Sequence, residues 1–139
     1  MNLIPAYLLL AVSVAIHATG LIFLLRWILR AHSNHPAPLW KSVWVLIRVS
    51  WSITALHIVE ILIWAGFYVL VDCMPDIHTA FYFSSVTYTT VGYGDLLLPI
   101  EWRGLAGAEA LTGILMAGLS TGFFFMVMNW LSAPTRTSS

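Results

Sequence analysis

The sequence at positions 89–95 is Thr-Thr-Val-Gly-Tyr-Gly-Asp. Its two glycines, Gly92 and Gly94, alternate with larger residues. Glycine reaches the left-handed half of backbone space freely, so this spacing suits a chain whose backbone alternates between left- and right-handed angles. Such a chain lines up its carbonyl oxygens as a ladder, to which Thr90 adds a hydroxyl oxygen. Oxygens placed in this way can replace the water shell of a cation that crosses a membrane.

The composition indicates that lipid is the main solvent of this chain. Of its 139 residues, 60% are hydrophobic and 9% are charged, whereas soluble domains carry about 25% charged residues. A helix that crosses a membrane needs about 20 mostly apolar residues. Three segments meet that requirement, namely Leu3–Leu25, Val49–Val71 and Leu105–Leu131. We therefore expect an all-α membrane protein with three transmembrane helices.

The segment between the second and third spans, Pro75–Pro99, lacks the length and apolarity to cross. It begins with Pro75-Asp76, which is a helix-start signal, and it contains the glycine-interrupted stretch. This pattern predicts a short re-entrant helix that returns as extended chain. Non-helical backbone at membrane depth is tolerated only inside protein or beside water, so the segment points to a pore.

Basic residues predict the orientation of the chain. Arg26, Arg30, Lys41 and Arg48 cluster between the first two spans, and cytoplasmic loops carry such an excess. We therefore expect the N-terminus and the re-entrant segment outside and the C-terminus in the cytoplasm. The expected organisation is an N-terminal helix with its connector over 1–38, a pore domain over 39–131 and a short cytoplasmic tail over 132–139.

From Thr89 to Asp95 the chain resembles the selectivity filter of the potassium channel family, without a substitution. The layout over Val49–Leu131 is similar to the two-helix bacterial pore module, with one extra N-terminal helix. The resemblance implies an outer helix at 39–71, a pore helix at 76–89, a filter at 90–94 and an inner helix at 105–131. It also implies a homotetramer in which K⁺ is held by the carbonyls of Thr90, Val91, Gly92 and Tyr93 and by the Thr90 hydroxyl.

The pore helix departs from the family pattern at two positions. Some members carry a Glu nine residues before the filter Asp, where this chain has Val86, and often a Trp thirteen residues before it, where this chain has Tyr82. Tyr82 can still donate a hydrogen bond to Asp95. Thr89, Asp95, Tyr82 and Val86 are therefore the expected supports of the filter, and the departures leave its inactivation open.

Counting along the third span places Gly113 where the family has its inner-helix hinge. The helical period then puts four residues on one stripe, which we expect to line the cavity: Ile114, Ala117, Thr121 and Phe125. A ring of Phe125 side chains would gate the pore by dewetting, and packing of Phe125 against lipid or protein is the alternative. Gly118 and Gly122 have the spacing of close helix contacts in membranes.

Glu60 lies near the centre of the second span, where an ionised side chain costs about 2.5–3.5 kcal/mol. It therefore needs a partner or a proton. His57 lies three residues earlier on the same face, and His17 in the first span is a second candidate. One hypothesis is a proton-sensitive contact between helices that biases the gate, and the other is a Glu60 that only packs helices. Glu109 is a further candidate, expected mainly as a brace behind the pore helix.

The main alternative to a conducting pore is a non-conducting regulatory membrane subunit of another channel. Such a subunit need not keep Thr90–Gly94. A proton-coupled transporter built on His57 and Glu60 would usually show two related halves. No nucleophile–base pair or metal triad is visible in the sequence, so an enzyme is not expected.

The expected partners are further copies of the chain and membrane lipid. Six acidic and six basic residues balance one another, so no bulk field favours nucleic acid. No cofactor is expected beyond K⁺ as the permeant ion. Short linkers and missing targeting signals favour a bacterial inner membrane.

Overall fold

The computed structural model of the chain describes residues 4–31 and 38–132. Residues 1–3, 32–37 and 133–139, which include most of the predicted connector and of the predicted tail, lie outside the described residues. Four α-helices form in the described part, without a strand: α1 (Ile4–Ala31), α2 (Leu39–Leu70), α3 (Ile77–Tyr88) and α4 (Arg103–Ser132). Of these, α1, α2 and α4 are long and apolar enough to cross a membrane. The predicted all-α membrane class with three spanning helices is therefore confirmed.

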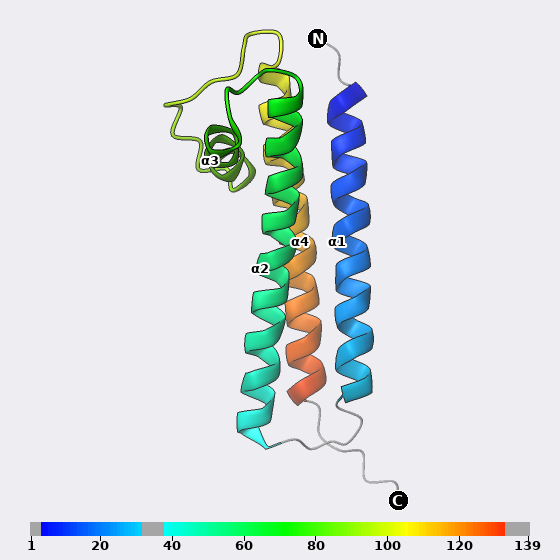
Figure 1. The fold of residues 1–139 in the computed structure, drawn as a ribbon. Coiled ribbons are helices and arrows are strands. Elements are labelled where there is room, and N and C mark those ends of the chain that lie inside the picture. The colour runs from blue at the N-terminus through cyan, green and yellow to red at the C-terminus, as the bar shows by residue number, and fades with distance from the viewer. Residues whose placement is uncertain (1–3, 32–37, 133–139) are drawn as a thin grey trace, which may run out of the picture.

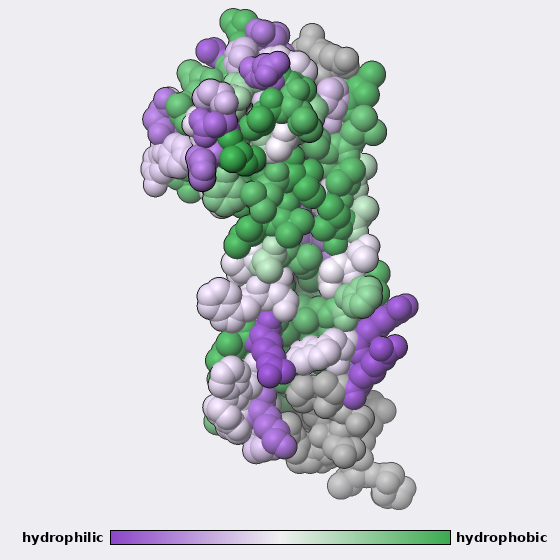
Figure 2. All heavy atoms as spheres, in the orientation of Figure 1, coloured by the Kyte–Doolittle hydropathy of each residue, from purple (hydrophilic) through white to green (hydrophobic). Residues whose placement is uncertain are grey.

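The three long helices run side by side as a bundle (Figure 1). α1 packs against α2 and α4, and the short α3 packs against the same two helices near one end of the bundle. The start of α1 lies at the same end as α3 and its loops, and the end of α4 lies at the opposite end. Hydrophobic residues cover the middle of the face shown in Figure 2, and hydrophilic residues gather toward its two ends. This arrangement fits three crossings of a membrane.

The outer helix implied for 39–71 corresponds to one continuous helix, α2. α2 has 32 residues, more than the roughly 20 that a crossing requires. Pro38 stands directly before it, and no proline interrupts it. The extra turns lie at the end of the bundle opposite α3. There the Arg48 guanidinium stands 5.7 Å from the centre of the Trp27 ring of α1.

Buried apolar residues form the core in three layers along the bundle. The layer beside α3 is built on Trp64, Tyr68, Phe83 and Leu105, and the layer at the other end is built on Ile28, Val45, Val49 and Val127. Ile61, Tyr88 and Met116 form the layer between them. α1 approaches α2 closely at Gly20, where a Cβ atom would lie 2.4 Å from the Leu56 side chain. Small residues permit such close approach between helices in membranes.

Candidate functional site

Residues 89–95 lead from the end of α3 toward the loop before α4, and their backbone alternates in hand. The φ angle is +63° at Thr90, +53° at Gly92 and +76° at Gly94. A non-glycine residue in this region carries strain of about 1–3 kcal/mol. Thr90 is held there in part by its N–H, which donates to the Thr87 carbonyl oxygen at 2.9 Å. The alternation expected from the glycine spacing is therefore present, and it begins at Thr90, two residues before the first glycine.

Close packing within the chain does not impose this conformation. All seven residues from 89 to 95 are exposed, including Val91 at 52% and Tyr93 at 70%. A Cβ atom at Gly92 or Gly94 would meet no atom within 4 Å. The stretch is fixed instead by its backbone bonds to α3, one of which runs from the Gly92 N–H to the Val86 carbonyl oxygen at 3.0 Å.

α3 begins at a side-chain cap, as the Pro75-Asp76 signal predicts. The Asp76 carboxylate accepts the backbone N–H groups of His78 at 2.9 Å and Thr79 at 3.0 Å, together with the Thr79 hydroxyl at 2.8 Å. These bonds, those from Thr79 foremost, hold the pKa of the Asp76 carboxyl below its ordinary value. At its other end α3 leads directly into Thr89, so the partially negative end of the helix lies beside the start of the stretch.

One side-chain bond supports the outer part of the stretch. The Tyr82 hydroxyl donates to the Asp95 carboxylate at 2.7 Å, which is the bond that the sequence predicts in place of the family's Trp and Glu. This bond raises the pKa of the Tyr82 hydroxyl. Val86 contributes only its carbonyl oxygen, which accepts from Gly92.

A pocket of about 460 Å³ lies where the inner end of the stretch meets α4 and α2. It is lined by residues of all three regions, among them His57, Tyr88, Thr89, Thr90, Gly113, Ile114 and Ala117. Ile114 is 58% exposed. Thr121 and Phe125 are also exposed but lie farther along α4, outside the lining of this pocket. The predicted stripe is therefore exposed on the surface of the single chain. Its first two residues, Ile114 and Ala117, line the same pocket as Thr89 and Thr90.

Gly113 is buried where α4 meets the end of α3. A Cβ atom at this position would lie 1.9 Å from the Tyr88 carbonyl oxygen. No side chain fits in that space, because the neighbouring atoms belong to the backbone of α3. The glycine that the sequence marks as a hinge thus also lies at a point of close approach between these two helices.

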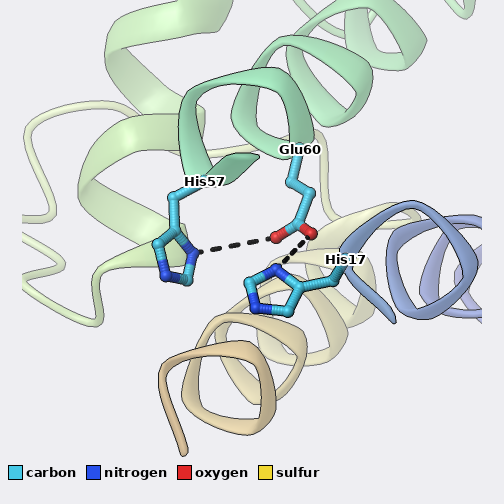
Figure 3. A group of neighbouring side chains, drawn as sticks. All are labelled: His17, His57 and Glu60. Atoms are coloured by element: carbon cyan, nitrogen blue, oxygen red, sulfur yellow. Dashed lines mark hydrogen bonds and ion pairs between the residues drawn. The ribbon is translucent and has the colours of Figure 1, made fainter. Parts of the chain in front are cut away.

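A buried polar cluster lies beside the pocket (Figure 3). His17 and His57 both point at the Glu60 carboxylate, with Nδ1 of His17 2.8 Å from Oε1 and Nδ1 of His57 3.8 Å from Oε2. The Tyr88 hydroxyl donates to Glu60 and lies 3.0 Å from Nδ1 of His57. Ser120 Oγ lies 3.0 Å from Nε2 of His17 and 3.1 Å from Nε2 of His57. The cluster therefore joins all four helices at one point.

Glu109 lies behind α3, as the sequence predicts. It is fully buried, accepts the Tyr68 hydroxyl at 2.7 Å and is hydrogen-bonded to Ser84 of α3. Ser84 Oγ also lies 3.0 Å from the Ile61 carbonyl oxygen. Ser84 therefore contacts both Glu109 of α4 and the backbone of α2, so that Glu109 and Ser84 together tie α3 to α2 and α4.

Comparison with known protein families decides the class of this protein. A family model described as an ion channel matches residues 56–129, more than half of the chain. The chain belongs to this ion channel family. No curated protein and no solved structure matched it. The matched segment runs from α2 through α3 and the glycine-interrupted stretch to α4, and membership favours an integral membrane channel over an enzyme.

The fold of the channel brings most of the predicted site residues together. The stretch 90–94, its supports and Gly113 meet around the end of α3, and Glu60 has both predicted histidine partners. The roles assigned to these residues remain predictions.

Sequence reasoning missed four hydroxyl groups around the two buried carboxylates. Tyr68, Ser84 and Tyr88 are bonded to the carboxylates themselves, and Ser120 is bonded to the two histidines. The sequence feature that could have identified them is their polarity, because Tyr88 and Ser84 lie four residues apart on one side of a short helix. Their contacts depend on the relative depth and rotation of four helices, which the sequence does not specify.

Proposed function

We propose that four copies of this chain form a potassium-selective pore with residues 90–94 as its filter. The observation that carries the proposal is the alternating backbone, with positive φ at Thr90, Gly92 and Gly94 of a Thr-Val-Gly-Tyr-Gly motif. Alternation of this kind turns successive carbonyl oxygens toward one side. Four such loops around an axis form rings of carbonyl oxygens that replace the hydration shell of K⁺.

The exposure of the stretch supports an assembly of several chains. A single strand of carbonyls cannot surround an ion, and the exposed Val91 and Tyr93 side chains leave apolar surface for neighbouring subunits to cover. Gly118 and Gly122 have open space beside them within the chain. A neighbouring helix can therefore approach α4 closely there.

The surroundings of the threonines favour a cation. The C-terminal end of α3 carries a partial negative charge, and it adjoins the pocket that Thr89, Thr90, Ile114 and Ala117 line. In a tetramer this pocket would border the inner cavity, where the ion waits below the filter. Gating would act at the filter, at the inner helix around Gly113, or at Phe125.

The orientation follows from charge. Arg26, Arg30, Lys41 and Arg48 are exposed in the half of the bundle opposite α3, and an excess of basic residues marks the cytoplasmic side. The filter and the start of α1 then face outward, and α4 ends in the cytoplasm.

The test is flux into liposomes that contain the purified full-length chain, with K⁺ or Na⁺ as the permeant ion. Gly92→Ala and Gly66→Ala form a matched pair, because neither Cβ would meet an atom within 4 Å of its own chain, and only Gly92 has a positive φ. We expect K⁺ flux to exceed Na⁺ flux in the wild type and in Gly66→Ala, and K⁺ selectivity to be lost in Gly92→Ala. Selective flux that survives in Gly92→Ala would contradict the filter assignment. Absence of flux in the wild type would favour a non-conducting regulatory subunit.

A further inference from the structure

The buried polar cluster is formed by five side chains: His17, His57, Glu60, Tyr88 and Ser120. When both histidines are neutral, it contains more hydrogen-bond contacts than protons to form them. Five contacts join the five side chains, and each hydrogen bond needs one proton. With Glu60 ionised, the two neutral histidines, the serine and the tyrosine bring one proton each. Four protons for five contacts leave one contact with two facing lone pairs.

The same count locates the missing proton. Tyr88 donates to Glu60, so the Tyr88 oxygen accepts the Nδ1–H of His57. Nε2 of a neutral His57 then accepts the Ser120 hydroxyl proton. His17 directs its Nδ1–H to Glu60, and its Nε2 meets the Ser120 oxygen at 3.0 Å with no proton between them. One more proton, shared by His17 and Glu60, completes all five bonds, and this count assigns the ring tautomers.

Charge balance favours the same state. With four protons the cluster has a net charge of −1, at a place where His17 and Glu60 are fully buried among membrane-spanning helices. With five protons it is neutral, which a membrane interior strongly favours. We propose that the cluster is a binding site for one excess proton, and that this proton fastens α1 to the conducting part of the chain. The consequence for conduction rests on the proposed function, whereas the proton site does not.

A divalent metal ion fits the cluster less well than a proton does. His17, His57 and Glu60 offer ligand atoms within 4.8 Å of one another. Tetrahedral zinc holds its ligands at about 2.0–2.1 Å, which separates the ligand atoms by about 3.3 Å. Nδ1 of His17 and Oε1 of Glu60 lie 2.8 Å apart, in direct hydrogen-bond contact. Zn²⁺ beside one carboxylate would also leave a net charge of +1.

Titratable groups from three helices meet at this proton: His17 of α1, His57 and Glu60 of α2, and Tyr88 of α3. α4 contributes the Ser120 hydroxyl, and its buried Glu109 is engaged by Tyr68 and Ser84. Tyr88 immediately precedes the threonines of the filter stretch. Loss of the proton breaks the bond between His17 of α1 and Ser120 of α4. Ser120 also bonds to His57, which in turn bonds to Tyr88, so we expect conduction to decrease as pH rises.

The test follows thermal unfolding of the full-length chain in detergent and K⁺ flux in liposomes, with a chelator present throughout. Both are measured between about pH 5 and pH 9, on either side of the ordinary titration of histidine. Above about pH 6.5, where the histidines of the unfolded chain are largely neutral, the folded state holds one proton more than the unfolded state, so over this range the melting temperature should fall as pH rises and level off above the midpoint at which the proton leaves. K⁺ flux should decrease through the same midpoint.

Three substitutions isolate the cluster. Glu60→Gln removes the carboxylate and keeps an acceptor for His17, so the midpoint should disappear from both measurements. Ser120→Ala keeps every titratable group but removes the hydrogen-bond acceptor of the extra proton. The midpoint should therefore move down by about one pH unit, which corresponds to tenfold weaker binding of the proton. Thr112→Val is the matched control on α4, because that buried hydroxyl donates to the Ala108 carbonyl oxygen of its own helix. It should keep the wild-type midpoint.

The outcomes separate the two proposals. A wild-type melting curve without a midpoint, or an unchanged midpoint in Ser120→Ala, would overturn the proton site. So would a response that is absent with the chelator and appears only when Zn²⁺ replaces the chelator, which would identify a metal. A melting midpoint without K⁺ flux at any pH would leave the proton site standing and reject the proposed function. Should Ser120→Ala fail to fold, loss of the midpoint in Glu60→Gln and His17→Gln decides the matter, and its survival in either overturns the proposal.

Discussion

Replacement of Gly113 by alanine tests how α4 is held against the end of α3. A Cβ atom at this position would lie 1.9 Å from the Tyr88 carbonyl oxygen and 2.8 Å from the carbonyl carbon. Ordinary contact begins at 3.4 Å, so the two helices would have to separate by about 1.5 Å. The obstructing atoms belong to the backbone, and no side-chain rotation relieves the clash.

The expected cost follows from two opposing effects. Overpacking of a core costs about 1–3 kcal/mol, and we expect the upper part of this range because backbone has to move. Alanine is better than glycine in a helix by about 1 kcal/mol, which offsets part of the cost. The net loss in the free energy of unfolding should be about 2 kcal/mol, close to a 30-fold change in the unfolding equilibrium. K⁺ flux should also decrease, because Tyr88 precedes the filter stretch.

Thermal unfolding of the assembled protein measures the loss, and flux into liposomes measures its effect on conduction. Gly66→Ala in α2 and Gly107→Ala in α4 are the controls, since a Cβ atom at either position meets no atom within 4 Å. Both should be neutral or stabilising by up to about 1 kcal/mol. A wild-type melting temperature for Gly113→Ala would refute the close-contact argument. Wild-type stability combined with reduced flux would instead support the hinge that the sequence predicts.

Three further predictions concern the supports of the pore helix. Glu109→Gln keeps a hydrogen-bond acceptor for Tyr68 and Ser84 and should unfold within about 1 kcal/mol of the wild type, whereas Glu109→Leu leaves both hydroxyls without their partner and should lose about 2–3 kcal/mol in thermal unfolding. Tyr82→Phe removes the bond to Asp95 and should lower K⁺ flux while keeping the preference for K⁺ over Na⁺; unchanged flux would show that the bond is dispensable. Asp76→Ala should lower the melting temperature at neutral pH. Because the pKa of Asp76 is lowered in the folded state, this difference should disappear as pH falls below about 4, and a difference that persists in acid would contradict the capping argument.

The parts of the site that sequence alone predicts are those that depend on local backbone chemistry. The glycines at 92 and 94 permit positive φ without strain, and the structure has it there. The Asp76 cap and the Tyr82–Asp95 bond follow from short separations along one chain segment. The three spans follow from length and apolarity, because the cost of burying backbone in lipid leaves a helix as the only solution.

The parts that sequence alone does not predict depend on how separate helices are rotated and how deep they lie. Ser120 carries no motif, and it joins the cluster only because α4 turns that face toward α1 and α2. Gly113 is similar: counting along the chain gives it a hinge role, whereas its contact with Tyr88 depends on the crossing of α3 and α4. Side-chain pairs between helices set such details, and nothing in either segment alone encodes them.

The polar cluster also explains why α1 belongs to the frame of the channel although the matched family segment begins only at residue 56. Between membrane helices apolar contacts specify little, because lipid tails are as apolar as leucine. Close approach at Gly20 fixes the distance between α1 and α2. The bonds of His17 to Glu60 and Ser120 fix the rotation and depth of α1 as well, because a turn or a shift of that helix would leave buried polar groups unpaired. Since Glu60 is also bonded to Tyr88, directly before residues 89–95, a movement of α1 would change the support of that stretch.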